Sequence, residues 1–331
     1  MESVNRVVGD LFPDTYIYRV PSHESLSDRT RDFVRRSSWC FIGGTNILSS
    51  DIQPWGLWRL DRSGANALGS TRTVCLGTGW RDYMSSPTPE SRALLTTALS
   101  SEHIHAARDR YTQDHLVGLG LRSDFTSCPT TWSLTTTHCE TIPTARAKSA
   151  VVTVTAWSPE RELDVIWLDM VRKSYEKVYF FSQMQDDFAY LFSLSFNDIQ
   201  MIGATLAAYD EFLEKNDVDF IGTRLHGGIR ALQKGRRALI LSIDNRATEM
   251  GKDTGLPVVS RSNAAEIANW ITTCPALNLD LPHEAISRWK AQFSPEARAS
   301  AKPVLALPES LSKPNLAKRA KAAAKMLLGR A

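Results

Sequence analysis

Short apolar runs alternate along this chain with longer segments in which apolar residues recur at helical spacing. In the first half, the apolar runs predict strands at residues 15–20, 39–42, 73–76, 103–107 and 125–128. The segments between them predict helices at residues 25–36, 89–99 and 111–119. Regular alternation of strand and helix is typical of a parallel sheet with helices on both faces.

A second series of the same kind begins after a threonine-rich stretch without clear periodicity, residues 133–148. It predicts strands at residues 150–155, 177–181, 218–221, 238–243 and 257–259, and helices at residues 159–175, 199–215 and near residue 248. Two successive series predict an α/β protein with two Rossmann-like domains that face a cleft. We place these domains at residues 1–140 and 141–275, followed by C-terminal helices within residues 276–331, which we expect to cross back to the first domain.

The stretch from residue 219 to residue 244 has the pattern strand, turn, helix, strand. The turn places Arg224 and His226 at a helix start, where unpaired N–H groups and the helix dipole favour an anion. Gly227 and Gly228 would let a ligand approach the backbone. Alternatively, the arginine and histidine are ordinary surface residues and the glycines only mark the turn.

Two turns of the first half carry polar groups in a similar position. The first follows residues 39–42 and contains Gly44 and Asn46, with Asp51 beyond it. The second follows residues 103–107 and contains Arg108, whose neighbours Asp109 and Thr112 are typical helix-capping residues. His103 and His105 share a strand face, which suits packing better than a metal because the sequence places no third ligand.

Composition narrows the class of protein. The chain has 331 residues and a net charge of only +3, which gives no indication of a nucleic-acid partner. Its five cysteines contain no CxxC pair, so the sequence indicates neither a disulfide framework nor a zinc site. The N-terminus lacks the pattern of a secretion signal and no stretch is long and apolar enough to span a membrane, so we expect a cytoplasmic protein. Residues 313–331 carry six basic residues and no acid. A basic amphipathic helix at residues 317–328 could bind the inner face of a membrane, although solvated basic tails are also common.

Several of these segments resemble the polysaccharide pyruvyl transferases, whose fold is similar to that of GT-B glycosyltransferases. The most specific is Gly222-Thr223-Arg224-Leu225-His226, similar to the family's G-x-R-L-H signature, with Asp244-Asn245-Arg246 after the next strand. Gly43-Gly44-Thr45-Asn46 resembles a G-G-x-N turn, and Arg108-Asp109 with Thr112 and Leu116 resembles an R-D-x-x-S/T-x-x-x-L stretch. The chain departs from the family pattern at Cys128-Pro129, where members often have Asp-Pro, and at Arg246, where lysine is frequent.

The resemblance implies transfer of pyruvate from phosphoenolpyruvate to two hydroxyls of a sugar, free or in a lipid-linked oligosaccharide, with release of phosphate. Arginine forks match both the carboxylate and the phosphate of this donor, so no metal or cofactor is expected. The implied catalytic residues are Arg108, Arg224 and His226. His226 would act as the acid: its imidazolium form, with a pKa of about 6.5, would protonate the enol of the donor. The implied donor site is completed by Leu225, Gly227, Gly228 and Arg246, and the implied acceptor site contains Gly44, Asn46 and Asp51.

Two other classes of function remain open from the sequence. A GT-B nucleotide-sugar glycosyltransferase would use the same architecture and could hold a diphosphate at the same helix start. A non-catalytic module that binds a phosphorylated ligand or a sugar would keep the arginines without using His226 as an acid.

Overall fold

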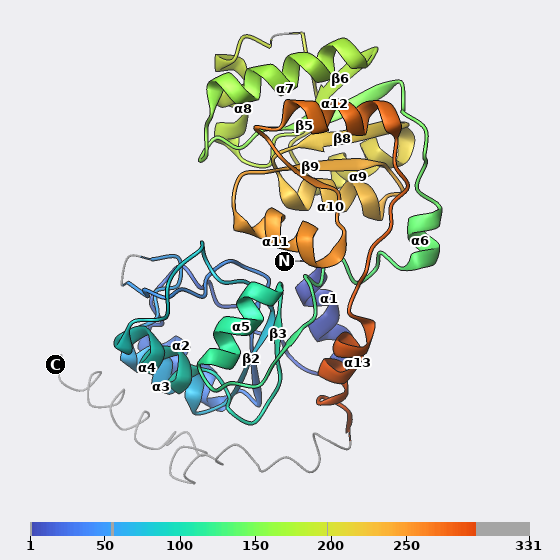
Figure 1. Cartoon of the computed structure of the whole chain (residues 1–331). Coiled ribbons are helices and arrows are strands. Elements are labelled where there is room, and N and C mark those ends of the chain that lie inside the picture. Colours follow the sequence, from blue (N-terminus) through green and yellow to red (C-terminus); the bar gives the residue numbers. More distant parts are fainter. Residues whose placement is uncertain (1, 54–55, 197, 296–331) are drawn as a thin grey trace, which may run out of the picture.

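Two separate parallel sheets organise the protein, as the alternating pattern predicts. The computed structural model describes residues 2–53, 56–196 and 198–295 (Figure 1). The first sheet has the strand order β1-β2-β3-β4 and the second the order β10-β9-β8-β5-β6-β7. Every pair of neighbouring strands in both sheets is parallel. The predicted α/β class is therefore confirmed, while the boundaries at residues 140 and 275 stay predictions.

The first sheet is covered on both faces. Its strands are β1 (Trp39–Gly43), β2 (Arg72–Thr78), β3 (His105–Ala107) and β4 (Ser123–Phe125). Apolar side chains of α2 (Asp28–Arg36), α3 (Arg62–Gly69), α4 (Pro89–Ala98) and α5 (Arg110–Gly118) form the core on one face. The opposite face is covered by α1 (Glu2–Leu11) and α13 (His283–Ala291). This sheet is thus completed by a helix from the far end of the described chain.

The second sheet contains a reversal of strand order that matters for ligand binding. Its strands are β5 (Ser149–Thr153), β6 (Lys177–Phe180), β7 (Gln200–Met201), β8 (Val218–Gly222), β9 (Ala238–Ser242) and β10 (Val258–Ser260). From β5 the chain adds strands first on one side, through β6 and β7, and then on the other, through β8, β9 and β10. The switch point therefore lies between β5 and β8, which is where open α/β sheets bind ligands beyond their carboxyl ends.

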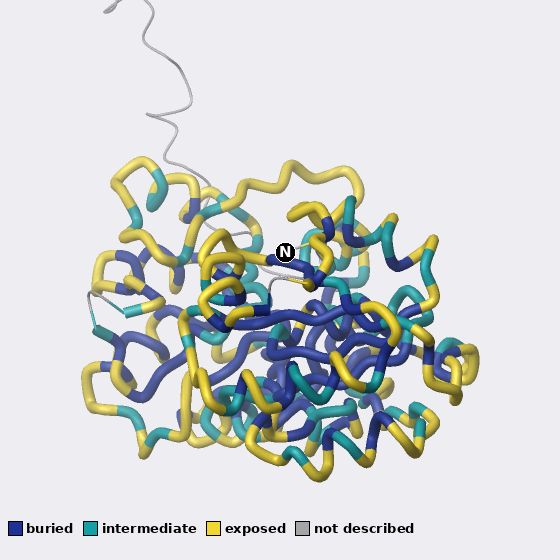
Figure 2. The backbone as a smooth tube through the Cα atoms, turned by 90° about the horizontal axis from the view of Figure 1, so that it is seen from above, coloured by how far each residue is buried: buried dark blue, intermediate teal, exposed yellow. Residues whose placement is uncertain are grey.

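Helices lie on both faces of the second sheet as well. The core on one face involves α9 (Leu206–Lys215), α10 (Leu225–Gln233) and α11 (Asn245–Thr254). The core on the other involves α7 (Arg161–Ser174), α8 (Gln185–Ser193) and α12 (Ala264–Thr273). Figure 2 shows the result, with buried strands inside and exposed helical surfaces outside.

Each sheet and the helices that cover it form one lobe, and the chain crosses between the two lobes twice. Residues 126–148 run from β4 to β5 and include α6 (Thr136–Glu140). Four of their side chains pack into the core beside α10, those of Cys128, Leu134, Cys139 and Ile142. The return crossing leads from α12 to α13. There Trp289 and Phe293 are buried against Phe12 and Phe41 of the first lobe.

The structure corrects several sequence predictions. Residues 15–20 form no strand: Tyr16 and Tyr18 are exposed, so their alternation with Ile17 and Arg19 does not reflect a buried face. The helix predicted at residues 199–215 is divided into β7 and the shorter α9. Four helices were not predicted from the sequence, α1, α3, α8 and α12, because only packing shows which of their residues form a buried face. The helix predicted at residues 317–328 lies outside the described residues.

Among the helices of the described residues, none combines the length and the apolar character needed to cross a bilayer.

Candidate active site

The turn between β8 and α10 lies at the switch point and is fixed by contacts with β5. Gly222 ends β8 so close to β5 that a Cβ there would lie 2.3 Å from the Thr153 Oγ1 atom. The Thr223 and Thr155 hydroxyls hydrogen-bond at 2.7 Å, and the Arg224 N–H donates to Thr153 Oγ1 at 3.2 Å. The glycine is therefore required by the close approach of two strands, and the start of α10 is held rigidly at the carboxyl edge of the sheet.

Arg224 is held by a carboxylate of its own lobe. Its guanidinium forms a two-pronged ion pair with Asp187, which is 1% exposed, and its Nε atom also donates to the Val154 carbonyl oxygen at 3.3 Å. Asp187 lies in the first turn of α8, a helix that the sequence pattern did not reveal, so this pair was missed. Direct contact of Arg224 with a donor stays a prediction, because in this structure Asp187 occupies its fork.

The residues after Arg224 pack α10 onto the sheet. A Cβ at Gly228 would lie 2.5 Å from Ile240 Cγ1, and one at Gly227 would lie 2.9 Å from Gln183 Nε2. Leu225 is buried in the core beneath the helix. These observations give Gly227 and Gly228 a packing role. Contact of these glycines and of Leu225 with a donor stays a prediction.

Arg108 lies on the other lobe and is almost completely buried. Its Nε atom donates to Asp109 Oδ2 at 2.9 Å and its Nη2 atom to Asn46 Oδ1 at 3.0 Å. Asp109 also caps α5, as the sequence predicts, by accepting from the Thr112 N–H at 2.8 Å. Gly79 packs directly against the guanidinium, because a Cβ at Gly79 would lie 2.1 Å from Arg108 Cζ. The first-lobe turns that contain Asn46, Gly79 and Arg108 therefore meet around this one cation.

Asn245 joins this cluster to the second lobe. It accepts a hydrogen bond from Asn46 Nδ2 at 3.4 Å and donates from its own Nδ2 to the Trp80 carbonyl oxygen at 3.0 Å. Asn245 is the first residue of α11 and is buried. The sequence motif contained Asn245 but gave it no role, because its partners Asn46 and Trp80 lie 199 and 165 positions away along the chain and only tertiary structure places them.

His226 lies within the electrostatic reach of both lobes. Its pKa is lowered to about 4, chiefly by burial among protein atoms and also by the positive charges of Arg246, the N-terminus and Arg108, while Asp244 acts in the opposite direction. The residue is nevertheless exposed to solvent, so the imidazole is surrounded by protein but open to a ligand. The pKa of about 6.5 expected from the sequence is thus too high for the unliganded protein, because the sequence shows neither the burial of the ring, which is the main cause, nor the nearby positive charges.

A thiol lies within reach of the imidazole. Cys128 Sγ lies 3.9 Å from His226 Nε2 and accepts a hydrogen bond from the Thr130 hydroxyl at 3.1 Å. Cys128 is buried in the segment that crosses between the lobes. A thiol is a weak hydrogen-bond partner, so it does little to stabilise an imidazolium.

Arg246 is held close to the same place. Its Nε and Nη2 atoms donate to Asp244 Oδ2 at 2.9 and 2.6 Å, and its guanidinium stacks over Trp157 at 5.6 Å. Asp244 in turn caps α11. The charges of Arg108 and Arg246 therefore both act on His226, whereas Arg224 is bound to Asp187.

The other predicted residues have local partners. Gly44 adopts a positive φ of 52° and packs against Val4 of α1, and Asp51 is exposed and accepts from Gln53 Nε2 at 2.6 Å. Their acceptor contacts stay predictions. His105 is fully buried, with Nδ1 accepting from the Cys75 N–H at 3.1 Å and Nε2 lying 2.8 Å from the Ser100 carbonyl oxygen, so it has a packing role. Burial lowers its pKa to about 4 and keeps it neutral.

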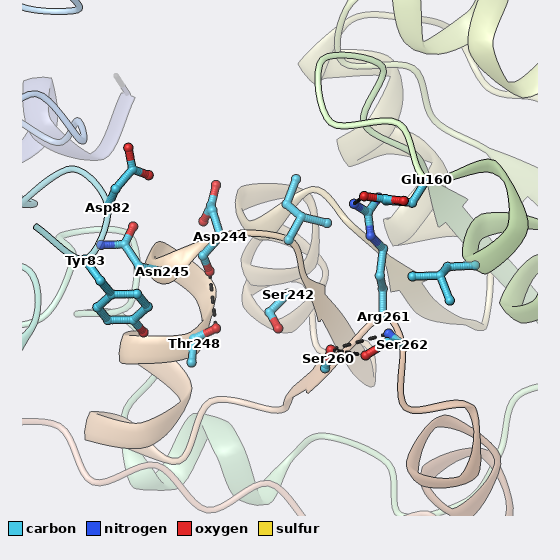
Figure 3. A pocket seen from close by; sticks show the side chains of 12 residues that line it. Asp82, Tyr83, Glu160, Ser242, Asp244, Asn245, Thr248, Ser260, Arg261 and Ser262 are labelled. Carbon is cyan, nitrogen blue, oxygen red and sulfur yellow. Dashed lines mark hydrogen bonds and ion pairs between the residues drawn. The ribbon is translucent and has the colours of Figure 1, made fainter.

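A polar cavity of about 500 Å³ opens beside Asn245, at the carboxyl ends of β9 and β10 (Figure 3). Its wall includes Asp82 and Tyr83 from the first lobe, and Glu160, Ser242, Asp244 and Arg261 from the second. The sequence analysis identified none of these as a ligand-binding group. The position of Ser242 and Asp244 at the carboxyl end of β9 could have indicated a binding site, but the residues that the first lobe contributes to the cavity could not be predicted from the sequence.

Comparison with known proteins places the fold and the family. The chain is similar in structure to Staphylococcus aureus MnaA in complex with UDP, with a TM-score of 0.51 and 12% identity over 90% of this chain and 87% of that one. It is similarly related to a putative UDP-N-acetylglucosamine 2-epimerase from Listeria monocytogenes, with a TM-score of 0.51 and 14% identity over 89% and 87% of the two chains. At this identity the likeness shows the two-lobed, GT-B-like fold alone.

Sequence comparison is more specific about the family. None of the curated proteins matches this chain. The sequence profile described as "Polysaccharide pyruvyl transferase" matches residues 1–245, a span that includes Asn46, Arg108, the Arg224–Gly228 turn and Asn245. This chain therefore belongs to the polysaccharide pyruvyl transferase family of enzymes.

Proposed function

We propose that this enzyme transfers pyruvate from phosphoenolpyruvate to two hydroxyls of one sugar in a cell-surface polysaccharide or its precursor. The products are a cyclic ketal and inorganic phosphate. The observation that carries the proposal is that Arg108 from one lobe and Arg246 from the other both act electrostatically on His226, which is exposed to solvent.

The donor is small and strongly anionic, so it requires several fixed positive groups. Arg108 is oriented by Asp109 and Asn46, and Arg246 by Asp244 and Trp157. The start of α10 adds unpaired backbone N–H groups and the positive end of a helix dipole. Together these groups can bind a carboxylate and a phosphate without a metal or an organic cofactor.

The first step of the proposed reaction is the transfer of a proton to carbon. Protonation of the methylene carbon of the donor develops positive charge at the neighbouring carbon, which one sugar hydroxyl attacks with loss of its proton. The second hydroxyl then displaces phosphate from the same carbon and closes the ketal. His226 is the proton donor in this proposal, because it is the titratable group exposed beside the proposed anion site.

The lowered pKa of His226 links its protonation to donor binding. Without donor, burial and the charges of Arg246 and Arg108 keep the imidazole neutral at pH 7. A bound trianion offsets these positive charges and raises the pKa of the ring, so the donor is expected to bind together with a proton. The acid is thereby produced mainly when the donor is present.

The first experiment replaces His226 with Gln and measures phosphate release with phosphoenolpyruvate and a sugar acceptor. We expect turnover to fall by about 10² to 10⁴, the usual effect of losing a general acid. In the native enzyme, kcat/KM for phosphoenolpyruvate should rise as the pH falls from 8 to 5. The reason is that the required imidazolium becomes more populated as the pH approaches the free-enzyme pKa of about 4. His226→Gln should lose that part of the profile.

His283→Gln is the matched control, because this histidine is exposed at the start of α13. It should retain native turnover and the native pH profile. Native turnover in His226→Gln would refute the proton-donor role. Absence of phosphate release by the native enzyme with every acceptor tested would refute the proposed donor or reaction.

The location of the reaction is a separate part of the proposal. We place the enzyme in the cytoplasm, with residues 313–331 attracting it to anionic lipid near lipid-linked acceptors. Removal of these residues should weaken binding to vesicles that contain phosphatidylserine, while activity on a soluble sugar is retained. Unchanged vesicle binding, measured by co-sedimentation, would refute the membrane contact.

A further inference from the structure

We infer that the cavity at the ends of β9 and β10 is the binding site of the acceptor sugar. The inference rests on the proposed function, since it separates an acceptor site from the donor site around Arg108 and His226. The cavity volume of about 500 Å³ is in the range of small-molecule sites, and both lobes contribute to its wall. This location differs from the acceptor site that the sequence predicts at Gly44, Asn46 and Asp51.

The charges on the cavity wall favour a neutral ligand over the anionic donor. The wall contains three carboxylates, those of Asp82, Glu160 and Asp244, and one guanidinium, that of Arg261. Arg261 is buried and already interacts with Asp164 at 3.4 Å and with the Ser158 carbonyl oxygen at 2.7 Å. Each of the three carboxylates is itself paired, Asp82 with Arg81 at 3.1 Å, Glu160 with Arg261 at 3.9 Å and Asp244 with Arg246 at 2.6 Å. Among the described residues, the wall therefore offers no unpaired cation to bind the phosphate of phosphoenolpyruvate or of a nucleoside diphosphate. Carboxylates readily accept hydrogen bonds from the hydroxyls of a neutral sugar.

The uncharged groups of the wall also suit a sugar. Hydroxyls come from Ser242, Thr248, Ser260 and Ser262, and within the described residues the Ser242 hydroxyl has no hydrogen-bond partner. Tyr83 adds a ring that is 61% exposed and is held in place by a 2.7 Å hydrogen bond from its hydroxyl to Glu249. The negative face of an aromatic ring attracts the C–H groups of a sugar ring. Figure 3 shows Tyr83 and Glu160 on opposite walls of the cavity, so a ligand between them would contact both lobes.

The cavity adjoins the donor site through two consecutive residues. Asn245 lines the cavity and also accepts the hydrogen bond from Asn46, which in turn holds Arg108. Asp244 lines the cavity, binds Arg246, and acts electrostatically on His226. A sugar in the cavity would therefore present its hydroxyls beside the donor carbon, as transfer requires.

The test compares substitutions on the cavity wall with one just outside it. Glu160→Gln removes a carboxylate whose side chain is 59% exposed, and Ser242→Leu fills part of the cavity. Glu162→Gln is the matched control, because this glutamate is exposed in the first turn of α7 and does not line the cavity. The acceptors are the methyl glycosides of glucose, galactose and mannose, each with a free 4,6-diol.

We expect Glu160→Gln and Ser242→Leu to raise KM for the reacting glycoside roughly tenfold or more, the effect of losing a hydrogen bond to a charged group or the space for the ring. KM for phosphoenolpyruvate should change less than about twofold, and Glu162→Gln should change neither constant. A raised KM for phosphoenolpyruvate with an unchanged glycoside KM would assign the cavity to the donor and overturn the inference. Unchanged values for both substrates in both variants would overturn it as well.

A binding measurement keeps the inference separate from the proposed reaction. Saturation-transfer NMR of the same glycosides, without phosphoenolpyruvate, should detect binding to the native enzyme and weaker binding to Glu160→Gln. Such binding without any phosphate release would refute the proposed function but support the sugar site. Failure of all three glycosides to bind or react would count against the site. Stabilisation of the native enzyme by UDP, lost in Glu160→Gln, would reveal a nucleotide site instead. Because Glu160 is exposed, this variant decides the question even if Ser242→Leu does not fold.

Discussion

Arg108 and Arg224 look alike in the sequence, each at the start of a helix after a strand, but their surroundings differ in the folded protein. Arg224 faces the buried carboxylate of Asp187, which forms an ion pair with no other cation among the described residues. Arg108 shares its guanidinium between Asp109 and Asn46 and reaches the other lobe through Asn245. The charge of Arg108 also acts on His226. At the residue scale, therefore, one arginine chiefly maintains the fold and the other connects the fold to the site.

This difference predicts that Arg224→Ala destabilises the protein. Loss of the guanidinium leaves the Asp187 carboxylate buried and unpaired, which should lower the free energy of unfolding by about 3 kcal/mol. Urea denaturation measures the change, and KM for phosphoenolpyruvate should be determined on the same samples. If Arg224 serves only the donor, KM will rise while the denaturation midpoint stays native. The double variant Arg224→Ala with Asp187→Asn should recover part of the stability, because no buried charge remains.

At the element scale, α10 carries the site because its glycine face lies directly on the sheet. Gly228 contacts Ile240 and Phe220, so α10 approaches β8 and β9 more closely than a side chain would permit. Its N-terminal turn is consequently held at the switch point. A small residue in the helix thus determines the position of His226 two residues earlier.

Gly228→Ala should therefore destabilise the protein although alanine favours helices. The added methyl group would lie 2.5 Å from Ile240 Cγ1, and overpacking of this kind costs about 1 to 3 kcal/mol, more than the gain of about 1 kcal/mol in helix propensity. Gly9→Ala in α1 is the control, since nothing lies within 4 Å of a Cβ there, and it should be neutral or stabilising. Thermal unfolding compares the two. A higher Tm for Gly228→Ala than for the native protein would contradict the packing role of this glycine.

At the scale of the whole molecule, the two lobes depend on each other for their cores. α13 follows the second sheet in sequence but covers the first sheet, with Trp289 completely buried against Phe41 and Phe293. On the cleft side, α11 adds contacts between the lobes, including the Tyr83–Glu249 and Arg110–Asp253 hydrogen bonds. The distance between the two walls of the site is set by these contacts together.

Trp289→Ala should consequently destabilise the first lobe, although residue 289 lies far beyond it in sequence. Deletion of a fully buried tryptophan costs about 3 to 5 kcal/mol, which circular dichroism would detect as a lower Tm. Trp289→Phe should cost much less, because the buried indole N–H has no hydrogen-bond partner within the described residues. Ser287→Ala, at an exposed position of the same helix, is the control. A native Tm in Trp289→Ala would show that α13 does not stabilise the first sheet.

Most of the strands and the two-sheet plan could be predicted from the sequence, because a buried parallel strand requires a continuous apolar run whatever surrounds it. β1, β2, β5, β8 and β9 correspond to such runs. The Arg224–Gly228 turn could be predicted for a similar reason, since a glycine after a strand and before a helix is a local signal. The strand predicted at residues 15–20 failed because alternation alone does not show that a neighbouring strand is present to pair with it.

Tertiary structure decided what those local signals could not contain. Neither the pairing of Arg224 with Asp187 nor the link from Asn46 to Asn245 leaves a pattern in the sequence, because each joins residues of different elements. The pKa of His226 depends on arginines from both lobes, and the polar cavity has walls from both. A sequence determines which side chains can be buried, where the chain can form a turn and which residues carry charge. Electrostatic interaction depends on distance through space, so only the folded chain determines which of those charges act on one another.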